Sequence, residues 1–285
     1  LTGGARIPLI VPANEQGAGF MAAGYARSSG RVGVALVTSG PGATNTVTPI
    51  RDCMADSVPI VVICGQVPTA AIGSDAFQEA PVASIMGAVA KHVFLVTDPA
   101  KLEATVRTAF EIARTGRPGP VVIDVPKDVQ NWQGEYLGQG TLPIPGYRVR
   151  MDQAAACALA NADAERFFEL LGGSQRPLVY AGGGVVNGEA AAPLRAFAAA
   201  FDIPVVTTLM GIGAMDTQDP LCLRMLGMHG AAFANYAVED CDFLIAIGAR
   251  FDDRVAGDPQ RFAANARAIA QYDKILKDSP NAELA

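Results

Sequence analysis

The sequence has few of the residues on which metal and redox sites depend. Among its 285 residues are only two histidines, His92 and His229, and a single tryptophan. Its five cysteines stand alone along the chain, and no two of them have the spacing of a CxxC motif. These shortages argue against a multi-histidine metal centre and against a zinc or dithiol site. They predict reduced thiols in the core of a cytosolic protein.

Basic charge and long apolar runs are also scarce. The 22 Lys and Arg residues are outnumbered by 28 Asp and Glu residues, so the formal net charge is −6, whereas a nucleic-acid-binding face is usually basic. No apolar run approaches the ~20 residues that a membrane span requires. We therefore expect no nucleic-acid partner and no membrane span. The sequence shows no secretory signal or transit stretch, and its start with Leu1 rather than Met predicts that residues are missing.

What the chain has instead is an alternation of short β-branched runs with alanine-rich amphipathic stretches. Continuous Val, Ile and Leu runs separated by helices are typical of a parallel sheet covered on both faces. The predicted fold class is therefore α/β, with two doubly wound parallel-sheet domains. The predicted strands are Val32–Val37, Ile60–Cys64, Val93–Val96, Val121–Val125, Leu178–Ala181, Val205–Thr208 and Phe243–Ile247, and the predicted helices are Gln16–Ser28, Thr44–Asp56, Leu102–Arg114, Ala164–Leu171, Ala190–Phe201 and Ala231–Glu239.

Changes in composition divide the chain. Residues 131–160 are polar and rich in Gly and Pro, which is typical of a linker. The pattern predicts one domain over residues 1–130 and a second over 161–285. Residues 266–285 turn polar where a further core strand is due, so we expect a short surface helix or a tail unrelated to the sheet.

Glu15 follows the apolar run Ile7–Val11 and precedes the predicted helix Gln16–Ser28. It is therefore expected near a strand end and at a helix N-terminus. An acid in this place can simply interact with the helix dipole. It can also be held in a cleft to exchange a proton with a ligand nitrogen. The pattern alone leaves both interpretations open.

Glycine-rich turns follow several predicted strands, at the sheet edge where open α/β folds bind ligands. Thr38–Asn45 could present N–H groups to an anion or form an ordinary turn. Ala181–Gly184 is a weak dinucleotide signal that a tight turn also explains. Arg250–Arg254 holds two arginines and two aspartates, which suit either an anion or a surface ion-pair cluster. Arg117, between glycines and prolines, is either an anion clamp or part of a capped loop.

Taken in order, several segments resemble the large catalytic subunit of acetohydroxyacid synthases, within the thiamine-diphosphate-dependent enzymes. From residue 15 to about residue 260 they read EQGAGFMAAGYARSSGRVGVALVTSGPGATN, DSVPIVVICGQVP, DAFQEAP, ARTGRPGPVVIDVPKDVQ, LGMHG and GARFDDRVAG. The resemblance implies that residues 1–130 form the pyrimidine-binding domain and 161–285 the central FAD-type domain. It implies a transferase that decarboxylates pyruvate and passes the two-carbon unit to pyruvate or 2-ketobutyrate. This is the first common step toward valine, leucine and isoleucine.

Individual positions match the functional residues of that family. Glu15 matches the glutamate that hydrogen-bonds to the aminopyrimidine ring of the cofactor. Lys127 matches a lysine at the mouth of the active-site channel, and Arg254 an arginine proposed to hold the second keto acid. With Gln78, these three form the expected catalytic set. Pro41, Asn45 and Gln78 match the thiamine pocket, and Arg117, Gly182, Gly183, Gly184, Thr208, Leu209, Leu226, Gly227, Met228, His229, Gly248, Ala249, Arg250, Asp252 and Val255 match contacts to an FAD of structural role.

The sequence also departs from the family pattern. Asn14 and Met210 stand where the family has His and Gln, and only Thr2–Ala5 resembles its Tyr-Pro-Gly-Gly loop. The Gly-Asp-Gly…Asn motif, which holds Mg²⁺ and the diphosphate in a third domain, is not present in this chain. The resemblance therefore implies a fragment whose metal ligands lie elsewhere, and we expect this polypeptide alone to be inactive.

The resemblance implies a homodimer or homotetramer of large subunits, with a small regulatory subunit as a further partner. The implied location is a bacterial cytoplasm or a eukaryotic organelle. Two alternatives stay open: another thiamine-dependent decarboxylase or carboligase, and a non-catalytic module for FAD binding or oligomerisation. Glu15 argues against a glyoxylate carboligase, which lacks a carboxylate there. The segments LGMHG and ARFDDRV favour the synthase.

Overall fold

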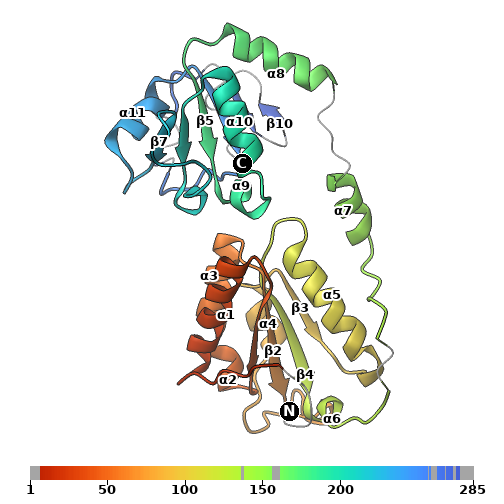
Figure 1. The fold of residues 1–285 in the computed structure, drawn as a ribbon. Coiled ribbons are helices and arrows are strands. Elements are labelled where there is room, and N and C mark those ends of the chain that lie inside the picture. The colour runs from red at the N-terminus through yellow and green to blue at the C-terminus, as the bar shows by residue number, and fades with distance from the viewer. Residues whose placement is uncertain are drawn as a thin grey trace. The chain divides into compact units, whose positions relative to one another are not determined.

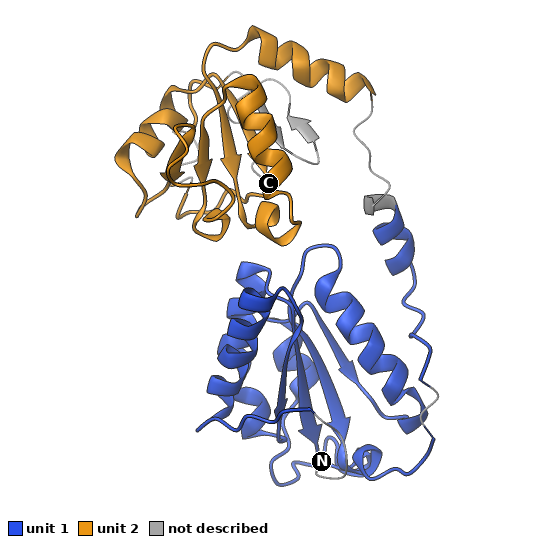
Figure 2. Ribbon diagram, in the orientation of Figure 1, with its two compact units in different colours: residues 1–157 blue, residues 158–285 orange. Residues whose placement is uncertain are grey.

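A computed structural model describes residues 7–135, 138–155, 161–255, 257, 262–266, 268–271 and 274–276. The chain forms two compact units, residues 1–157 and 158–285 (Figures 1 and 2). Each unit contains a sheet of mainly parallel strands between helices, which confirms the predicted α/β fold class. The assignment of roles to residues 1–130, 131–160 and 161–285 stays a prediction.

The first unit is built on a four-stranded parallel sheet with the order β1-β2-β4-β3. Its strands are β1 (Gly33–Val37), β2 (Ile60–Gln66), β3 (His92–Leu95) and β4 (Val121–Pro126). Its helices are α1 (Glu15–Ser29), α2 (Pro41–Thr44), α3 (Val47–Asp56), α4 (Val82–Gly87), α5 (Leu102–Arg114), α6 (Lys127–Gln130) and α7 (Tyr147–Ala155), with 3₁₀ turns at Thr69–Ala71 and Pro99–Lys101.

The two faces of this sheet carry different helices. Ile60, Val62 and Cys64 of β2 belong to a buried cluster with α1, α3 and α4. Val61 and Ile63, which alternate with them, pack in the cluster of α5 on the opposite face. Both faces of the central strands are therefore buried, which explains why β2 and β4 read as continuous apolar runs in the sequence.

Helix α1 has clear signals at both ends. The side chain of Asn14 accepts a hydrogen bond from the backbone N–H of Gly17 at 2.7 Å, which caps the N-terminus. Gly30 ends the helix with φ of 68°, a left-handed conformation that favours glycine, and its N–H donates to the carbonyl of Ala26. The Asn14 cap therefore fixes the start of α1 at Glu15, and the Gly30 cap fixes its end at Ser29.

Strand β1 lies at the edge of the four-stranded sheet. Its odd-numbered residues are buried under α1, but Val34 and Leu36 on the other face are exposed. Helix α5 covers β4 and part of β2 on that face and leaves β1 uncovered by the described residues. A parallel sheet is usually buried on both faces, so this bare strip is an unusual feature of the unit.

The second unit contains a six-stranded sheet with the order β10-β9-β8-β5-β6-β7. All neighbouring strands are parallel except β10 and β9. Helices α9, α10 and α8 pack on one face, and α11 packs on the other. The elements are α8 (Asn161–Gly173), β5 (Pro177–Ala181), α9 (Gly183–Asn187), α10 (Ala191–Phe201), β6 (Val205–Thr207), a 3₁₀ turn (Leu209–Gly211), β7 (Cys222–Met225), α11 (Ala232–Asp240), β8 (Phe243–Ile247), β9 (Ala268–Gln271) and β10 (Lys274–Leu276).

Two sequence predictions were wrong. Residues 7–11 form no strand, and their apolar side chains are exposed. Pro8 and Pro12 lack the amide hydrogens that a ladder needs, which accounts for this. The polar end of the chain is not unrelated to the sheet, because β9 pairs in parallel with β8, with Phe243 opposite Ala268. The strands β9 and β10 are only four and three residues long and lie among polar residues, so composition did not indicate them.

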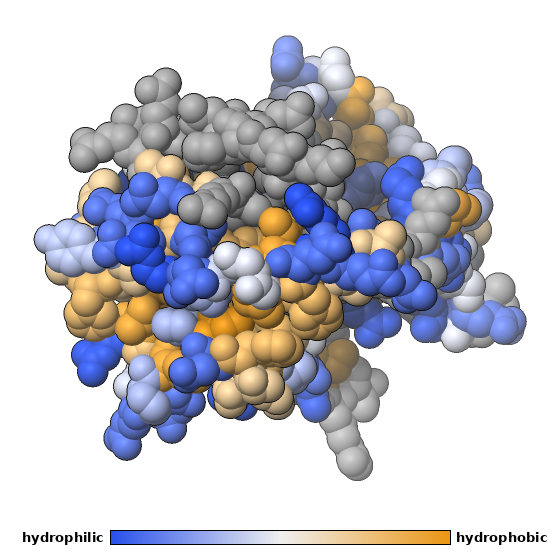
Figure 3. Space-filling model, turned by 90° about the horizontal axis from the view of Figure 1, so that it is seen from above, coloured by the Kyte–Doolittle hydropathy of each residue, from blue (hydrophilic) through white to orange (hydrophobic). Residues whose placement is uncertain are grey.

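The predicted linker contains a helix, α7, that its composition did not predict. Ile144 and Tyr147 pack against the α5 cluster, so this part of the segment belongs to the first unit. None of the helices in the described ranges is long and apolar enough to cross a bilayer. Figure 3 shows hydrophilic residues surrounding a group of hydrophobic ones on one face of the molecule.

Candidate functional site

The carboxyl edge of the first sheet brings Glu15 and Asn45 together. Glu15 is the first residue of α1, and Asn45 ends the short helix α2 that follows β1. The side-chain amide of Asn45 donates a hydrogen bond to Oε2 of Glu15 at 3.0 Å. This bond is the main cause of a lowered pKa of the Glu15 carboxyl. The carboxylate is partly exposed, so it is oriented by the protein and still accessible to a ligand.

The turn after β1 approaches Glu15 closely because it contains glycine. A Cβ added to Gly42 would lie 2.7 Å from Cγ2 of Thr38 and 3.7 Å from Oε1 of Glu15. Gly40 has φ of 58°, and a Cβ there would lie 2.5 Å from the carbonyl oxygen of Gln78. Gln78 itself has a left-handed φ of 60°. The loop that carries Gln78 is therefore seated against the turn after β1.

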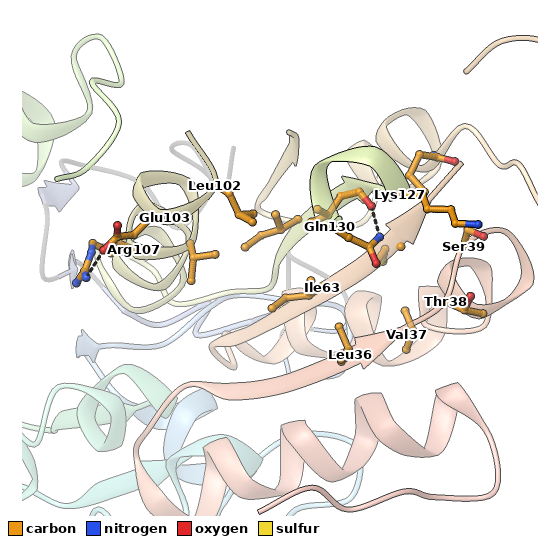
Figure 4. Close-up of a pocket in the computed structure, with 16 residues that line it drawn as sticks. Leu36, Val37, Thr38, Ser39, Ile63, Leu102, Glu103, Arg107, Lys127 and Gln130 are labelled. Atoms are coloured by element: carbon orange, nitrogen blue, oxygen red, sulfur yellow. Dashed lines mark hydrogen bonds and ion pairs between the residues drawn. The ribbon is translucent and has the colours of Figure 1, made fainter. Parts of the chain in front are cut away.

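A cavity of about 1080 Å³ opens on the other side of the same sheet edge. Figure 4 shows Leu36 and Ile63 pointing into it from β1 and β2. The ion pair of Glu103 and Arg107 lies at one end, and Lys127 lies at the other. Leu36, from the bare strip of β1, and Ile63 of β2 form part of its apolar floor.

The cavity and the predicted thiamine residues do not coincide. Lys127, the first residue of α6, lines the cavity, whereas Glu15, Asn45 and Gln78 do not. Thr38 lines the cavity and also contacts the position where a Gly42 side chain would lie, so it joins the two regions. The catalytic candidates Glu15 and Gln78 are thus grouped around the β1 turn, and Lys127 stands at the neighbouring cavity.

Arg117 holds the C-terminus of α3. Its Nε donates to the hydroxyl of Ser57 at 2.8 Å, and its terminal nitrogen donates to the carbonyls of Met54 and Ala55, each at 3.0 Å. Cations at this end of a helix satisfy free carbonyls and interact favourably with the dipole. The structure therefore favours the capping interpretation of Arg117 over the anion clamp.

We expect Arg117→Ala to lower the free energy of unfolding by about 1–2 kcal/mol, because three hydrogen bonds to α3 and its cap are lost. Urea denaturation measures this change. Arg114→Ala, which removes an exposed arginine of the same region, is the matched control and should change stability little. Unchanged stability in Arg117→Ala together with loss of flavin binding would contradict the capping role.

Four turns converge at the carboxyl edge of the second sheet. The N–H of Gly184 donates to the carbonyl of Gly248 at 2.9 Å, which joins the turns after β5 and β8. A Cβ on Gly182 would overlap that same carbonyl oxygen. The N–H of Thr208 donates to Ala181 at 2.9 Å, and the turn after β7 joins through a bond from Met228 to the carbonyl of Arg254 at 3.0 Å.

All the predicted FAD residues except Arg117, which lies in the first unit, stand along these four turns. Leu209 and Met228 are 68% and 67% exposed, so their apolar side chains are accessible to a ligand. Buried members are Gly182, Leu226 and Gly227; partly exposed ones are Gly183, Thr208, Ala249, Asp252 and Val255; and exposed ones are Gly184, His229, Gly248 and Arg250. The backbones leave no room for side chains where the turns cross, so glycine is required there.

The arginines of the β8 turn are paired with neighbouring aspartates. Arg250 lies 3.7 Å from Asp252, and Arg254 lies 3.6 Å from Asp253. All four side chains are largely exposed, so these pairs contribute little to stability. Their guanidinium groups can therefore exchange these partners for an anionic ligand at small cost.

The part of the chain that the structure describes contains no group of three or more His, Cys, Asp or Glu side chains placed to hold a metal ion. Cys157 lies outside the described residues, and the other four cysteines are free thiols. Burial raises the pKa of Cys53, Cys64 and Cys241 to about 12, so these thiols are protonated and unreactive.

Each unit contains a match to a known family. Residues 2–86 match the family described as thiamine pyrophosphate enzyme, N-terminal TPP binding domain, and residues 164–277 match thiamine pyrophosphate enzyme, central domain. The chain belongs to the thiamine pyrophosphate enzymes. Within this thiamine pyrophosphate enzyme, the Glu15–Asn45 pair lies in the first match and the four convergent turns lie in the second.

Curated relatives of this thiamine pyrophosphate enzyme are acetolactate synthases. The chain is 48% identical over 257 residues to acetolactate synthase 1, chloroplastic, of Zea mays, with 90% of this chain and 39% of that protein covered. It is 47% identical over 260 residues to the acetolactate synthase large subunit of Corynebacterium glutamicum, covering 91% and 41%. For the large subunit of Parasynechococcus marenigrum the identity is 49% over 262 residues, covering 91% and 42%. The chain spans about two fifths of the length of these relatives.

Sequence reasoning missed several residues of the first site. Thr38, Gly40 and Gly42 were recognised only as parts of a turn. In the structure Gly42 lies between Thr38 and Glu15, and Gly40 packs against the carbonyl of Gln78. Asp124 was included in the predicted strand Val121–Val125 without a role, and Gln66 fell just beyond the predicted strand Ile60–Cys64. The available signal was a polar side chain within an otherwise apolar run, as in IVVICGQ and VVIDVP.

Proposed function

We propose that this chain serves the acetolactate synthase reaction, in which pyruvate is decarboxylated and its two-carbon unit is transferred to pyruvate or 2-ketobutyrate. The observation that carries the proposal is the Glu15 carboxylate, held by Asn45 beside a glycine turn in a thiamine-binding domain. The identity of 47–49% to acetolactate synthases supports this substrate class.

The residues around Glu15 suit thiamine diphosphate. Gly42 leaves a space beside the carboxylate that a Cβ would fill, and Gln78 lies across the same turn. When bound, the cofactor supplies the electron sink for decarboxylation. Glu15 would exchange a proton with a nitrogen of the pyrimidine ring, and the hydrogen bond from Asn45 keeps the carboxylate oriented for that exchange.

Phe77 and Lys127 extend the proposed site. Phe77 is 89% exposed beside Gln78, where its ring could cover an aromatic ligand. Lys127 is exposed at the cavity and would attract the carboxylate of pyruvate. We assign Arg254 to the carboxylate of the second keto acid, since its guanidinium is exposed and weakly paired.

The four turns of the second unit suit FAD, which we propose as a structural cofactor. Gly182 and Gly184 carry no side chains, so a diphosphate can approach the backbone of these turns closely. The exposed side chains of Leu209 and Met228 offer apolar contacts to flat rings. Asp252 and Arg250 supply polar contacts at the edge of this surface.

We further propose that the chain acts within an assembly of large subunits, with Mg²⁺ and a small regulatory subunit as additional components. The exposed apolar side chains of Phe20, Met21 and Tyr25 on α1 support a protein contact there. We infer a cytoplasmic or organellar location, in line with bacterial and chloroplastic relatives.

A chimera tests the proposed function. The 260 matched residues of the Corynebacterium glutamicum large subunit are replaced by those of this chain. We expect acetolactate formation from pyruvate within about tenfold of the parent enzyme, since a tenfold change reflects only about 1.4 kcal/mol in the barrier. The parent enzyme is the positive control. A chimera that folds and binds FAD but forms no acetolactate would overturn the proposal.

A further inference from the structure

A polar pair is buried between β2 and β4. Gln66, the last residue of β2, is 6% exposed, and Asp124 in β4 is 1% exposed. The side-chain amide of Gln66 donates to Oδ2 of Asp124 at 3.0 Å. Their strand neighbours are apolar, and neither residue belongs to the predicted catalytic or cofactor sets.

Gln66 connects this pair to the loop that carries Gln78. The same amide nitrogen donates to the carbonyl of Ala80 at 3.1 Å. Oε1 of Gln66 accepts from the N–H of Val67 at 2.8 Å. Ala80 stands two residues after Gln78, whose carbonyl oxygen is packed against Gly40. The strands and the loop are therefore linked through one side chain.

Asp124 has no evident structural benefit of its own. Its Oδ1 is buried without a hydrogen-bond partner. Burial raises the pKa of Asp124 to about 6, while the bond from Gln66 opposes the rise. A buried and half-satisfied carboxyl is destabilising, and apolar residues of similar volume often serve a core better. The role of Asp124 therefore lies in the hydrogen bond that it accepts from Gln66.

We propose that Asp124 is a positioning residue that orients Gln66 and thereby fixes residues 76–80, with Gln78, at the rim of the thiamine site. Without the acceptor Oδ2 of Asp124, the amide nitrogen of Gln66 loses one of its two acceptors, and the amide can rotate away from Ala80. The role of Gln78 as a residue of the thiamine site rests on the proposed function. The link between Asp124 and the loop does not.

Hydrogen exchange of the full chain tests the link. In Asp124→Leu we expect amide exchange within residues 76–80 to rise about tenfold or more, as the local opening equilibrium shifts. Asp124→Asn retains an oxygen acceptor for Gln66 and should stay within about threefold of wild type. Thr105→Val, which alters a buried hydroxyl on α5, is the matched control and should leave this loop unchanged.

Calorimetric titration of the chimera, which contains the third domain, with thiamine diphosphate and Mg²⁺ supplies the second measurement. We expect affinity to fall about tenfold in Asp124→Leu and to be retained in Asp124→Asn, whatever the change in global stability. Should Asp124→Leu not fold, Gln66→Met removes the same link with a side chain of similar size. Unchanged loop exchange in these apolar variants, or equal disruption by Asp124→Asn, would overturn the proposal. Asp124→Leu in the chimera with the expected rise in loop exchange but an unchanged affinity for thiamine diphosphate would instead overturn the role assigned to Gln78.

Discussion

Glu15→Gln should lower the rate of acetolactate formation by the chimera about 100-fold or more. Glutamine has nearly the same shape and can still contact Asn45, but it cannot accept or release a proton at neutral pH. Removal of a positioned general acid–base group typically lowers rates by about 10²–10⁴. Steady-state assays of acetolactate measure the effect, and thermal unfolding with bound FAD shows that the fold is unchanged.

Two further variants make this expectation specific. Glu169→Gln neutralises an exposed carboxylate on α8 and should leave the rate unchanged. Asn45→Ala removes the hydrogen bond that lowers the pKa of Glu15, so that pKa should rise toward its ordinary value and the rate should fall less than in Glu15→Gln. A Glu15→Gln rate within threefold of the unmodified chimera would remove Glu15 from the reaction.

Gly182→Ala is expected to disrupt the second unit, with a loss of about 3 kcal/mol or more in unfolding free energy. The added methyl group would overlap the carbonyl of Gly248 and the Cα of Ala249, both backbone atoms that cannot rotate away. Urea denaturation measures the loss. Visible flavin absorbance of the purified chain reports whether the four convergent turns still bind FAD.

Gly172→Ala is the matched control for this substitution. Gly172 lies in α8, and a Cβ there has no atom within 4 Å. Alanine at this helical position should leave stability unchanged or raise it by a few tenths of a kcal/mol, because it restricts the unfolded chain. Equal stability of Gly182→Ala and Gly172→Ala would contradict the close approach of the two turns.

The strands that are buried on both faces could be predicted from the sequence. β8 is a continuous apolar run with the predicted bounds Phe243–Ile247, and β4 is apolar except for Asp124. Helix α5 likewise has its predicted bounds, because its apolar residues repeat at the helical period. Strand β7 (Cys222–Met225) was not predicted, because a partly exposed edge strand lacks the continuous apolar run that indicates a buried strand.

The candidate site was less accessible from the sequence. Glu15 and Asn45 are 30 residues apart, and only the family resemblance paired them with one ligand before the structure placed them 3.0 Å apart. The Gln66–Asp124 bond joins positions 58 residues apart and has no local signature. Such contacts depend on strand register, which composition and periodicity do not specify.

The bare strip of β1, formed by Val34 and Leu36, makes the protein prone to aggregate when it is concentrated. On its outer side, among the strands that the structure describes, β1 has no ladder partner, and Val34 and Leu36 stand beside its unpaired amides and carbonyls. An apolar sheet edge of this kind is a template for strand addition by another molecule. Concentrated or refolding solutions of the chain should therefore be prone to aggregate through β1. Val34→Lys would be the first substitution to make for crystallisation.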